Sequence, residues 1–341
     1  DHDGQAAYFG NVTVAAVTED LTWVGAGSTE VKVVASDAVG GDTFGESVAI
    51  DGDYAVVGAP RQVVAGAGAG AVYVYKKDGG NWNQVANLSS GVTNQGTYGD
   101  LFGISVSIHG DTIIVGSRGV SNFSGAAYIF TRNAGTDNWS NRYEITGSGN
   151  FGSSVAIYND TVLIGAYTDT NNSSESTGTA FIYERNGNVW DFVVKFIGET
   201  IYNAFGVNCA IYGNTAIVTS NQNDTSKGAA YIYTRTGTTW STTPYKIPGE
   251  ANYDYLSAVS VSGNTIVLGT HYNDSVGTSS GAVYIYTGSG TSWVKQTEIN
   301  GAAGESWGKD VSISGDILSF TSTLGKSYIY KRSGTTWTQQ V

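Results

Sequence analysis

The sequence predicts an all-β fold: a seven-bladed β-propeller built from four-stranded antiparallel blades. A Phe-Gly pair or a relative of it recurs about every 50 residues, and four strand-like runs fit into each interval. The chain contains 47 glycines and 22 tyrosines but only three prolines, and no window shows helical periodicity. We expect one domain over residues 1–341, with repeats that start near residues 9, 44, 102, 151, 205, 255 and 307.

The first two runs of each repeat predict a tight hairpin. In the clearest copy, strands are expected over residues 46–50 and 54–58, joined by a two-residue turn at Asp51-Gly52. Glycine or asparagine at the second turn position tolerates the positive φ that such a hairpin needs. The second run is almost continuously apolar, which indicates a strand that is buried on both faces.

The third and fourth runs carry aromatic residues at fixed places. The third run has two aromatic residues on alternate positions, such as Tyr73 and Tyr75, which places both rings on one face of a strand. Because the pair recurs in six repeats, we expect it to pack blades together and not to stack on a ligand. The fourth run begins with tryptophan, so we interpret these residues as structural anchors: Trp82, Trp139, Trp190, Trp240, Trp293 and Trp337.

The first 43 residues fit the repeat less well. Residues 9–17 and 21–27 match the first two runs, and residues 31–35 match either the third or the fourth, so that one strand is missing. Seven blades with an abbreviated first blade is the main prediction, and six full blades with an N-terminal extension is the alternative. Propellers usually close by joining both chain ends in one blade, but the sequence does not show which strand completes the first repeat.

Charge and composition exclude several functions. There are 17 basic and 29 acidic residues, a formal net charge of −12, and no basic cluster, which argues against nucleic acid and anionic membranes as partners. No apolar run reaches the length of a membrane span. The three histidines, His2, His109 and His271, accompany no nucleophile elbow, zinc-ligand spacing or phosphate loop, so we expect a protein without catalytic activity.

Three motifs carry a family resemblance. FG-x-SV-x-I at residues 44–50, VVGAP at 56–60 and GAVYVY at 70–75 together resemble the FG-GAP repeat, which builds the propeller of integrin α subunits. The resemblance extends over essentially the whole chain and implies a recognition role in cell adhesion or a related extracellular process. It is specific for the fold and leaves the function open, because propellers host many activities.

One feature departs from the integrin-like pattern. In the repeats of that family that bind calcium, a longer loop with alternating aspartates joins the first two runs, whereas here two residues join them in all six full repeats. Asp51 and Asp53 supply two carboxylates, but calcium takes about six to eight oxygen ligands. We therefore predict that the calcium sites are lost and that the protein holds no metal and no cofactor.

The long connections between runs two and three, and between run four and the next repeat, are expected to share one face. Such variable loops on a rigid scaffold are where binding usually resides, and flat rings with amide and carboxylate groups suit sugars. We predict glycan (lectin-like) or protein binding by this long-loop face; the alternative is a structural or adhesive module of a larger extracellular protein or filament. The candidate ligand-binding residues are Arg118, Phe123, Tyr167, Asp169, Asn171, Asn221, Asn223, Asp224, His271, Tyr272, Asn273 and Asp274.

Glycosylation acceptor triplets are frequent and fall mostly in expected loops or turns, although a chain rich in Asn, Ser and Thr also produces them by chance. They favour a secreted or cell-surface protein. The candidate asparagines are Asn11, Asn87, Asn122, Asn138, Asn159, Asn171, Asn172, Asn223 and Asn273.

Overall fold

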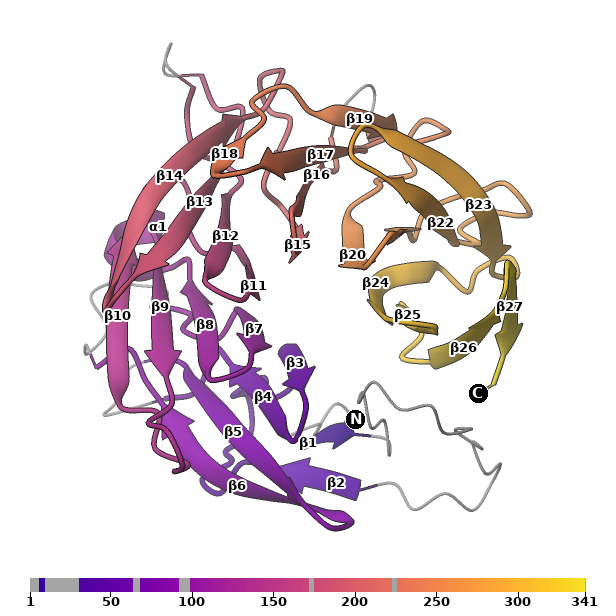
Figure 1. Ribbon diagram of the computed structural model, residues 1–341. Helices are drawn as coiled ribbons and strands as arrows, with labels where there is room; N and C mark the ends of the chain where they lie inside the picture. Colours follow the sequence, from indigo (N-terminus) through magenta and orange to yellow (C-terminus); the bar gives the residue numbers. More distant parts are fainter. Residues whose placement is uncertain are drawn as a thin grey trace. The chain divides into compact units, whose positions relative to one another are not determined.

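The structure, a computed structural model, describes residues 6–9, 31–63, 68–91, 99–171, 175–222 and 226–340. It confirms an all-β propeller fold made of four-stranded antiparallel blades (Figure 1). A four-residue helical element, α1 (Val120–Phe123), lies in the connection between the second and third strands of the second blade.

Six complete blades follow one another along the chain, each in the order inner to outer strand. The first three are formed by β3 (Ser47–Asp51), β4 (Tyr54–Ala59), β5 (Ala71–Asp78) and β6 (Asn81–Leu88); β7 (Ser105–His109), β8 (Thr112–Ser117), β9 (Ala126–Thr131) and β10 (Asn141–Thr146); and β11 (Ser154–Tyr158), β12 (Thr161–Ala166), β13 (Thr179–Asn186) and β14 (Val189–Ile197).

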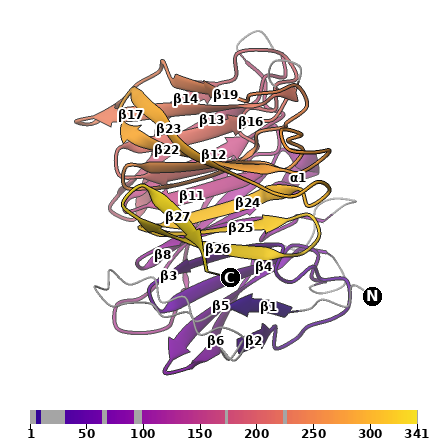
Figure 2. The same ribbon diagram turned by 90° about the vertical axis from the view of Figure 1, so that its right-hand side faces the viewer.

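The fourth blade has an interrupted outer strand, because β18 and β19 both pair with β17. The last blade, shown in yellow, is seen from another side in Figure 2. These blades are formed by β15 (Cys209–Tyr212), β16 (Thr215–Ser220), β17 (Ala229–Thr236), β18 (Thr239–Trp240) and β19 (Tyr245–Pro248); β20 (Ala258–Ser262), β21 (Thr265–Thr270), β22 (Ala282–Ser289) and β23 (Ser292–Asn300); and β24 (Trp307–Ser314), β25 (Ile317–Ser322), β26 (Ser327–Ser333) and β27 (Thr336–Gln339).

The described residues form six complete blades, which agrees with the alternative of six full blades and an N-terminal extension. Ahead of the first blade the structure shows a two-stranded sheet, in which β1 (Ala6–Phe9) pairs with β2 (Val31–Val34). The strand expected at 31–35 is thus present. Most of the strand expected at 9–17, and all of that at 21–27, lies outside the described residues. The segment that begins with β2 packs on the first blade: Val33 joins its apolar core, and Tyr75 donates a hydrogen bond to the Val34 carbonyl (2.8 Å).

The chain divides into two compact units. The first contains residues 1–169 and 182–193, and the second contains residues 170–181 and 194–341. The first unit holds the first two blades, and the second holds the last three.

The inner hairpins turn one residue later than the sequence predicted. In the first blade Asp51 pairs with Tyr54, so the turn residues are Gly52 and Asp53. Gly52 has φ +55°, which confirms the need for glycine but places it first in the turn. Asp51, the last strand residue, accepts a hydrogen bond from the Gly110 amide in the next hairpin (2.6 Å), and His109 Nδ1 accepts one from Asn159 (3.2 Å). The turn side therefore links neighbouring blades.

The Phe-Gly pair joins each blade to the one before it. The Phe102 amide donates to the Ala69 carbonyl of the first blade (3.1 Å), and its fully buried ring meets Tyr128 and Phe130 of the second blade edge-on, with centroids 5.4 and 6.0 Å apart. Equivalent parallel bridges join Gly125 to Phe151 and Gly178 to Phe205. The aromatic pairs of the third runs are thus packing residues, as predicted. They pack around the phenylalanine ring of the Phe-Gly pair.

The degenerate repeat that begins the fifth blade keeps this arrangement with a shift of one residue. Leu256, 1% exposed, pairs with Gly228 as the phenylalanines pair with their glycines. Leu256, and not Tyr255, therefore occupies the buried position that phenylalanine holds in the other repeats. Tyr255 is the residue before it and does not fill this position.

A second glycine of the motif lies where two blades touch. A Cβ atom on Gly58, in the VVGAP segment, would lie 2.1 Å from the carbonyl oxygen of Gly103 in the next blade. Gly116 and Gly269 have the same relation to Gly152 and Gly308. Only a residue without a side chain allows the backbones to approach this closely.

The tryptophans of the outer strands are anchors, as predicted. Trp190 is 5% exposed and lies under the Arg185 guanidinium, whose carbon is 5.0 Å from the indole centroid. Arg185 also donates to Thr112 Oγ1 of the preceding blade (2.6 Å) and pairs with Asp160. Similar Arg–Trp stacks recur at Trp139, Trp240 and Trp337.

Candidate ligand-binding site

A pocket of about 550 Å³ opens on the long-loop side of the second unit. Its walls come from two connections. The β19–β20 loop supplies Tyr253 and Tyr255, and the β21–β22 loop supplies Tyr272, Asp274 and Ser279. Tyr253 and Tyr272 are 60% and 50% exposed, and the rings of Tyr255 and Tyr272 meet edge-on with centroids 5.5 Å apart. The pocket thus presents phenol rings and one carboxylate to solvent.

Buried polar groups hold these two loops together. Asn273, 2% exposed, donates to the Asp254 carboxylate (3.3 Å) and to the Tyr284 hydroxyl (2.9 Å). Asp254 in turn accepts a hydrogen bond from the Ala251 amide (2.9 Å). Because the link runs through buried side chains and packed strands, the exposed rings are fixed before any ligand arrives, which lowers the entropy cost of binding.

The left-handed backbone of the two tyrosines contributes to their display. Tyr253 and Tyr255 have φ +67° and +52°, a conformation that non-glycine residues seldom adopt. The residue before the buried Phe or Leu is left-handed in other repeats too, as at Leu101 and Asn150, so the Tyr255 conformation belongs to the fold. Tyr253, three residues before Leu256, matches left-handed residues at the same place before other repeat starts, at Gly41, Gly99, Tyr202 and Gly304, so its conformation belongs to the fold as well.

The electrostatics of the pocket are acidic. Burial raises the pKa of the Asp254 carboxyl. The hydrogen bonds from the Ala251 amide and Asn273 oppose this shift, and the nearby Asp274 and Glu250 add to it. Asp274 itself is exposed and accepts a hydrogen bond from the Ser279 amide. The site therefore offers hydrogen-bond acceptors to hydroxyl or cationic groups and disfavours anions.

His271 lies beside the pocket, with its ring 4.2 Å from that of Tyr272. Its Nδ1 is buried without a hydrogen-bond partner in the described part of the chain. Burial lowers the pKa of His271, Lys309 lowers it further, and Asp310 opposes the shift. The imidazole is thus neutral at pH 7 and supports Tyr272 by packing.

This burial predicts a pH dependence of stability. Since the unfolded chain titrates His271 near 6.5 and the folded chain at lower pH, the neutral form contributes stability above that value, and the contribution is lost as the pH falls through it. We expect the fall in melting temperature from pH 7.5 to pH 5.5 to be smaller in His271→Gln than in the wild type. Parallel thermal melts measure this difference, and equal falls would show that the histidine is not held neutral.

The other candidate residues predicted from the sequence lie in separate places. Asp169 is 5% exposed and accepts a hydrogen bond from Ser148 Oγ of the β10–β11 loop (2.6 Å), and Asn171 pairs with Glu175 of its own loop. Tyr167 and Asn221 are half-buried. Asn223 and Asp224 lie outside the described residues. Arg118 and Phe123 line a different pocket in the first unit.

The glycosylation candidates also differ in their surroundings. Asn87, Asn122, Asn138 and Asn159 are exposed, and Asn171 is half-buried. The Asn273 amide, as noted, is hydrogen-bonded inside the fold, so a glycan there would displace a loop contact. Asn11, Asn172 and Asn223 lie outside the described residues.

Sequence reasoning missed Tyr253 and Tyr255. The signal available was the run Tyr253-Asp254-Tyr255 directly before the repeat start, where other repeats have smaller or single aromatic residues. Because Tyr255 also fits the repeat motif, the run of aromatic residues was not recognised as a candidate site.

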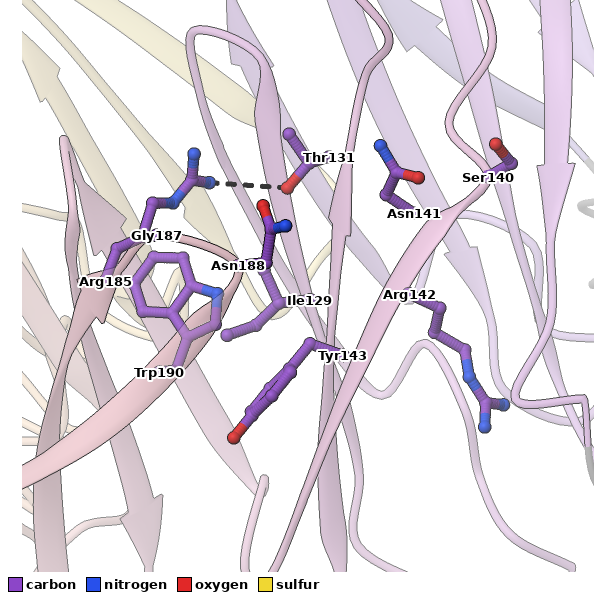
Figure 3. Close-up of a pocket in the computed structure, with 10 residues that line it drawn as sticks. All are labelled: Ile129, Thr131, Ser140, Asn141, Arg142, Tyr143, Arg185, Gly187, Asn188 and Trp190. Atoms are coloured by element: carbon purple, nitrogen blue, oxygen red, sulfur yellow. Dashed lines mark hydrogen bonds between the residues drawn. The ribbon is translucent and has the colours of Figure 1, made fainter.

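A groove of about 430 Å³ lies on the turn side of the first unit, between the outer parts of the second and third blades (Figure 3). Figure 3 shows the Arg185 guanidinium above Trp190 and bonded to Thr131. Arg142 pairs with Glu144 (3.2 Å), and Trp190 is nearly fully buried. Because its charged groups already have partners and its largest ring is covered, this groove offers a ligand less than the tyrosine pocket does.

The hairpin turns bear on the calcium prediction. All six inner hairpins have two-residue turns, and among the described residues no three His, Cys, Asp or Glu side chains gather as metal ligands. Asp51 uses its carboxylate on Gly110. We expect the melting temperature to be the same with EDTA and with added calcium, as measured by differential scanning calorimetry. A marked fall on chelation would reveal a stabilising metal site.

Recurring blades joined by Phe-Gly segments, with irregular loops along one side, define a binding or adhesive module of a fold that is typically non-catalytic. Family models match the FG-GAP repeat at residues 28–75, 82–130, 146–183 and 249–286, which together make up half of the chain. The chain therefore belongs to the FG-GAP repeat family. A search of curated proteins found no match. FG-GAP repeats are typical of extracellular proteins. No helix in the described ranges has the length and apolarity needed to cross a bilayer.

Proposed function

We propose that the protein is a non-catalytic extracellular recognition module that binds glycans through the pocket of Tyr253, Tyr255, Tyr272 and Asp274. One observation carries the proposal: rings from two loops surround one exposed carboxylate on a preorganised scaffold. Sugars present apolar C–H faces that stack on such rings and hydroxyls that donate to a carboxylate. The volume of about 550 Å³ accommodates a short oligosaccharide.

A glycan array, followed by calorimetric titration with the best neutral sugar found, tests this function. Tyr272→Ala removes an exposed ring without touching the buried Asn273–Asp254 link, and we expect it to weaken binding about tenfold or more. Tyr212→Ala is the matched control, because Tyr212 is a partly exposed tyrosine at the turn end of β15. Its affinity should equal that of the wild type.

Two outcomes would replace the proposal. Binding of choline in the same pocket, with no sugar bound, would assign it to an organic cation, since rings around a carboxylate also suit such ligands. No ligand on the array, with the native protein found only in large assemblies, would favour a structural or adhesive module of a larger extracellular protein or filament.

A further inference from the structure

Two of the seven arginines stand apart from the others. Four of the other five form ion pairs with carboxylates, and the fifth, Arg235, donates to Asn214 (3.0 Å). Arg61 and Arg118 have neither an ion pair nor a side-chain hydrogen bond within the described residues. The Nε atom of Arg118 is moreover buried without a partner. A buried donor on a charged group is costly to leave unpaired, so this atom indicates a missing acceptor.

These two arginines line one pocket of about 330 Å³ in the first unit. Arg61 begins the β4–β5 loop and Arg118 begins the β8–β9 loop, so two separate connections bring the charges together. Like charges in one pocket repel each other unless an anion lies between them. The pocket is thus electropositive within a chain whose formal net charge is −12.

Two acidic residues, Asp42 and Asp100, lie on the adjoining loops, and the Gly119 amide next to Arg118 donates to the Asp100 carbonyl (3.0 Å). Asp42 accepts a hydrogen bond from the Val39 amide (2.9 Å) and is 4% exposed. Asp100 is 1% exposed and lies close enough to Tyr128 in the core to help raise the pKa of that phenol. Neither forms an ion pair with Arg61 or Arg118 in the described chain.

The rest of the lining is apolar. Pro60, Leu101 and Phe123 complete the walls with the backbone of Gly68, and Phe123 is 37% exposed. Ser121, Asn122 and Phe123 are three successive residues with positive φ, which turn the chain sharply and place the ring at the pocket. An oxyanion that also carries a flat apolar face fits this combination, because guanidinium forks match oxyanions and the phenyl ring stacks on the face.

We propose that Arg61 and Arg118 bind the carboxylate of an acidic sugar, such as a hexuronic acid, whose ring lies against Phe123. The choice of a sugar over an acidic peptide rests on the proposed glycan function and on a pocket of the size of one compact ring. The anion site itself is independent of the tyrosine pocket, since the two share no residue.

Calorimetric titration of the whole chain with D-glucuronate and with D-glucose at low salt tests this site. We expect glucuronate to bind, glucose to bind at least tenfold more weakly there, and both Arg61→Gln and Arg118→Gln to weaken glucuronate binding about tenfold or more. Arg142→Gln removes the same charge from an arginine paired with Glu144 and should leave the affinity unchanged. Tyr272→Ala should leave it unchanged as well, which separates this site from the tyrosine pocket.

A folding defect in Arg118→Gln would not obscure the result. In the wild type, glucuronate should shift the Nε–Hε NMR signal of Arg118, and Arg118→Lys, which keeps the charge, should retain only part of the affinity. Equal binding of glucose and glucuronate, or wild-type affinity in both arginine-to-glutamine variants, would overturn the proposal. Binding of N-acetylglutamate by the same arginines, with glucuronate silent, would also overturn it and assign the site to an acidic protein partner.

Discussion

Replacing Phe102 by alanine is expected to lower the free energy of unfolding by about 3–5 kcal/mol, the usual cost of removing a large buried ring. The ring is fully buried, packs edge-on against Tyr128 and Phe130, and belongs to a residue whose amide is bonded to the preceding blade. The loss therefore opens a cavity where two blades meet. Urea unfolding followed by tyrosine and tryptophan fluorescence measures the change.

Phe192→Ala is the matched control. Phe192 lies in β14 of the same unit, is 57% exposed and makes one edge contact, with Tyr183. Its removal should cost less than about 1 kcal/mol, as surface substitutions usually do. Similar losses in the two variants would mean that the Phe-Gly ring is not what holds the blades together.

Gly58→Ala is the second change with a large expected effect. The new methyl group would lie 2.1 Å from the Gly103 carbonyl oxygen and 2.4 Å from Ser47 Oγ, so the first two blades must move apart. The separation also stretches the hydrogen bond that Ser47 Oγ donates to the same carbonyl (2.7 Å). We expect a loss of about 1–3 kcal/mol or more, as in other overpacked cores, measured by the same urea titration.

Gly80→Ala controls for the substitution itself. Gly80 is exposed at the β5–β6 turn, and a methyl group there would meet nothing within 4 Å. Its stability should match that of the wild type. Because Phe102 and Gly103 are consecutive, the double variant Gly58→Ala/Phe102→Ala should lose less than the sum of the two single losses. Full additivity would show that the glycine contact and the ring stabilise separate parts of the structure.

The proposed binding role would depend on this rigidity. The loops that carry Tyr253 and Tyr272 connect strands of the fourth and fifth blades. The buried Leu256 and its bridge to Gly228 maintain the spacing of these strands. A disturbed junction would thus be expected to displace the pocket walls as well as lower stability. The same reasoning applies in the first unit, where Arg118 follows β8 directly.

The sequence by itself determined the blades. Strand runs, turn glycines and paired aromatic residues are local signals that repeat, and each repeat reinforces the assignment of the others. Phe44, Phe102 and Phe151 begin repeats that are recognisably similar in sequence, and all three side chains are buried in the structure. The number of complete blades was less certain, because residues 1–43 follow the repeat only in part.

The tertiary structure alone decided which loop residues line pockets. Asn273 and Asp169 resembled ligand-binding residues but are buried and hydrogen-bonded to neighbouring loops or strands. Tyr253 and Arg61, in contrast, line pockets together with residues of connections that the repeat pattern does not relate. The physical reason is that a strand repeats its contacts with each blade, while a loop side chain takes its direction from local φ and from whichever neighbouring loop packs beside it. A period in the sequence records the first kind of contact and contains no information about the second.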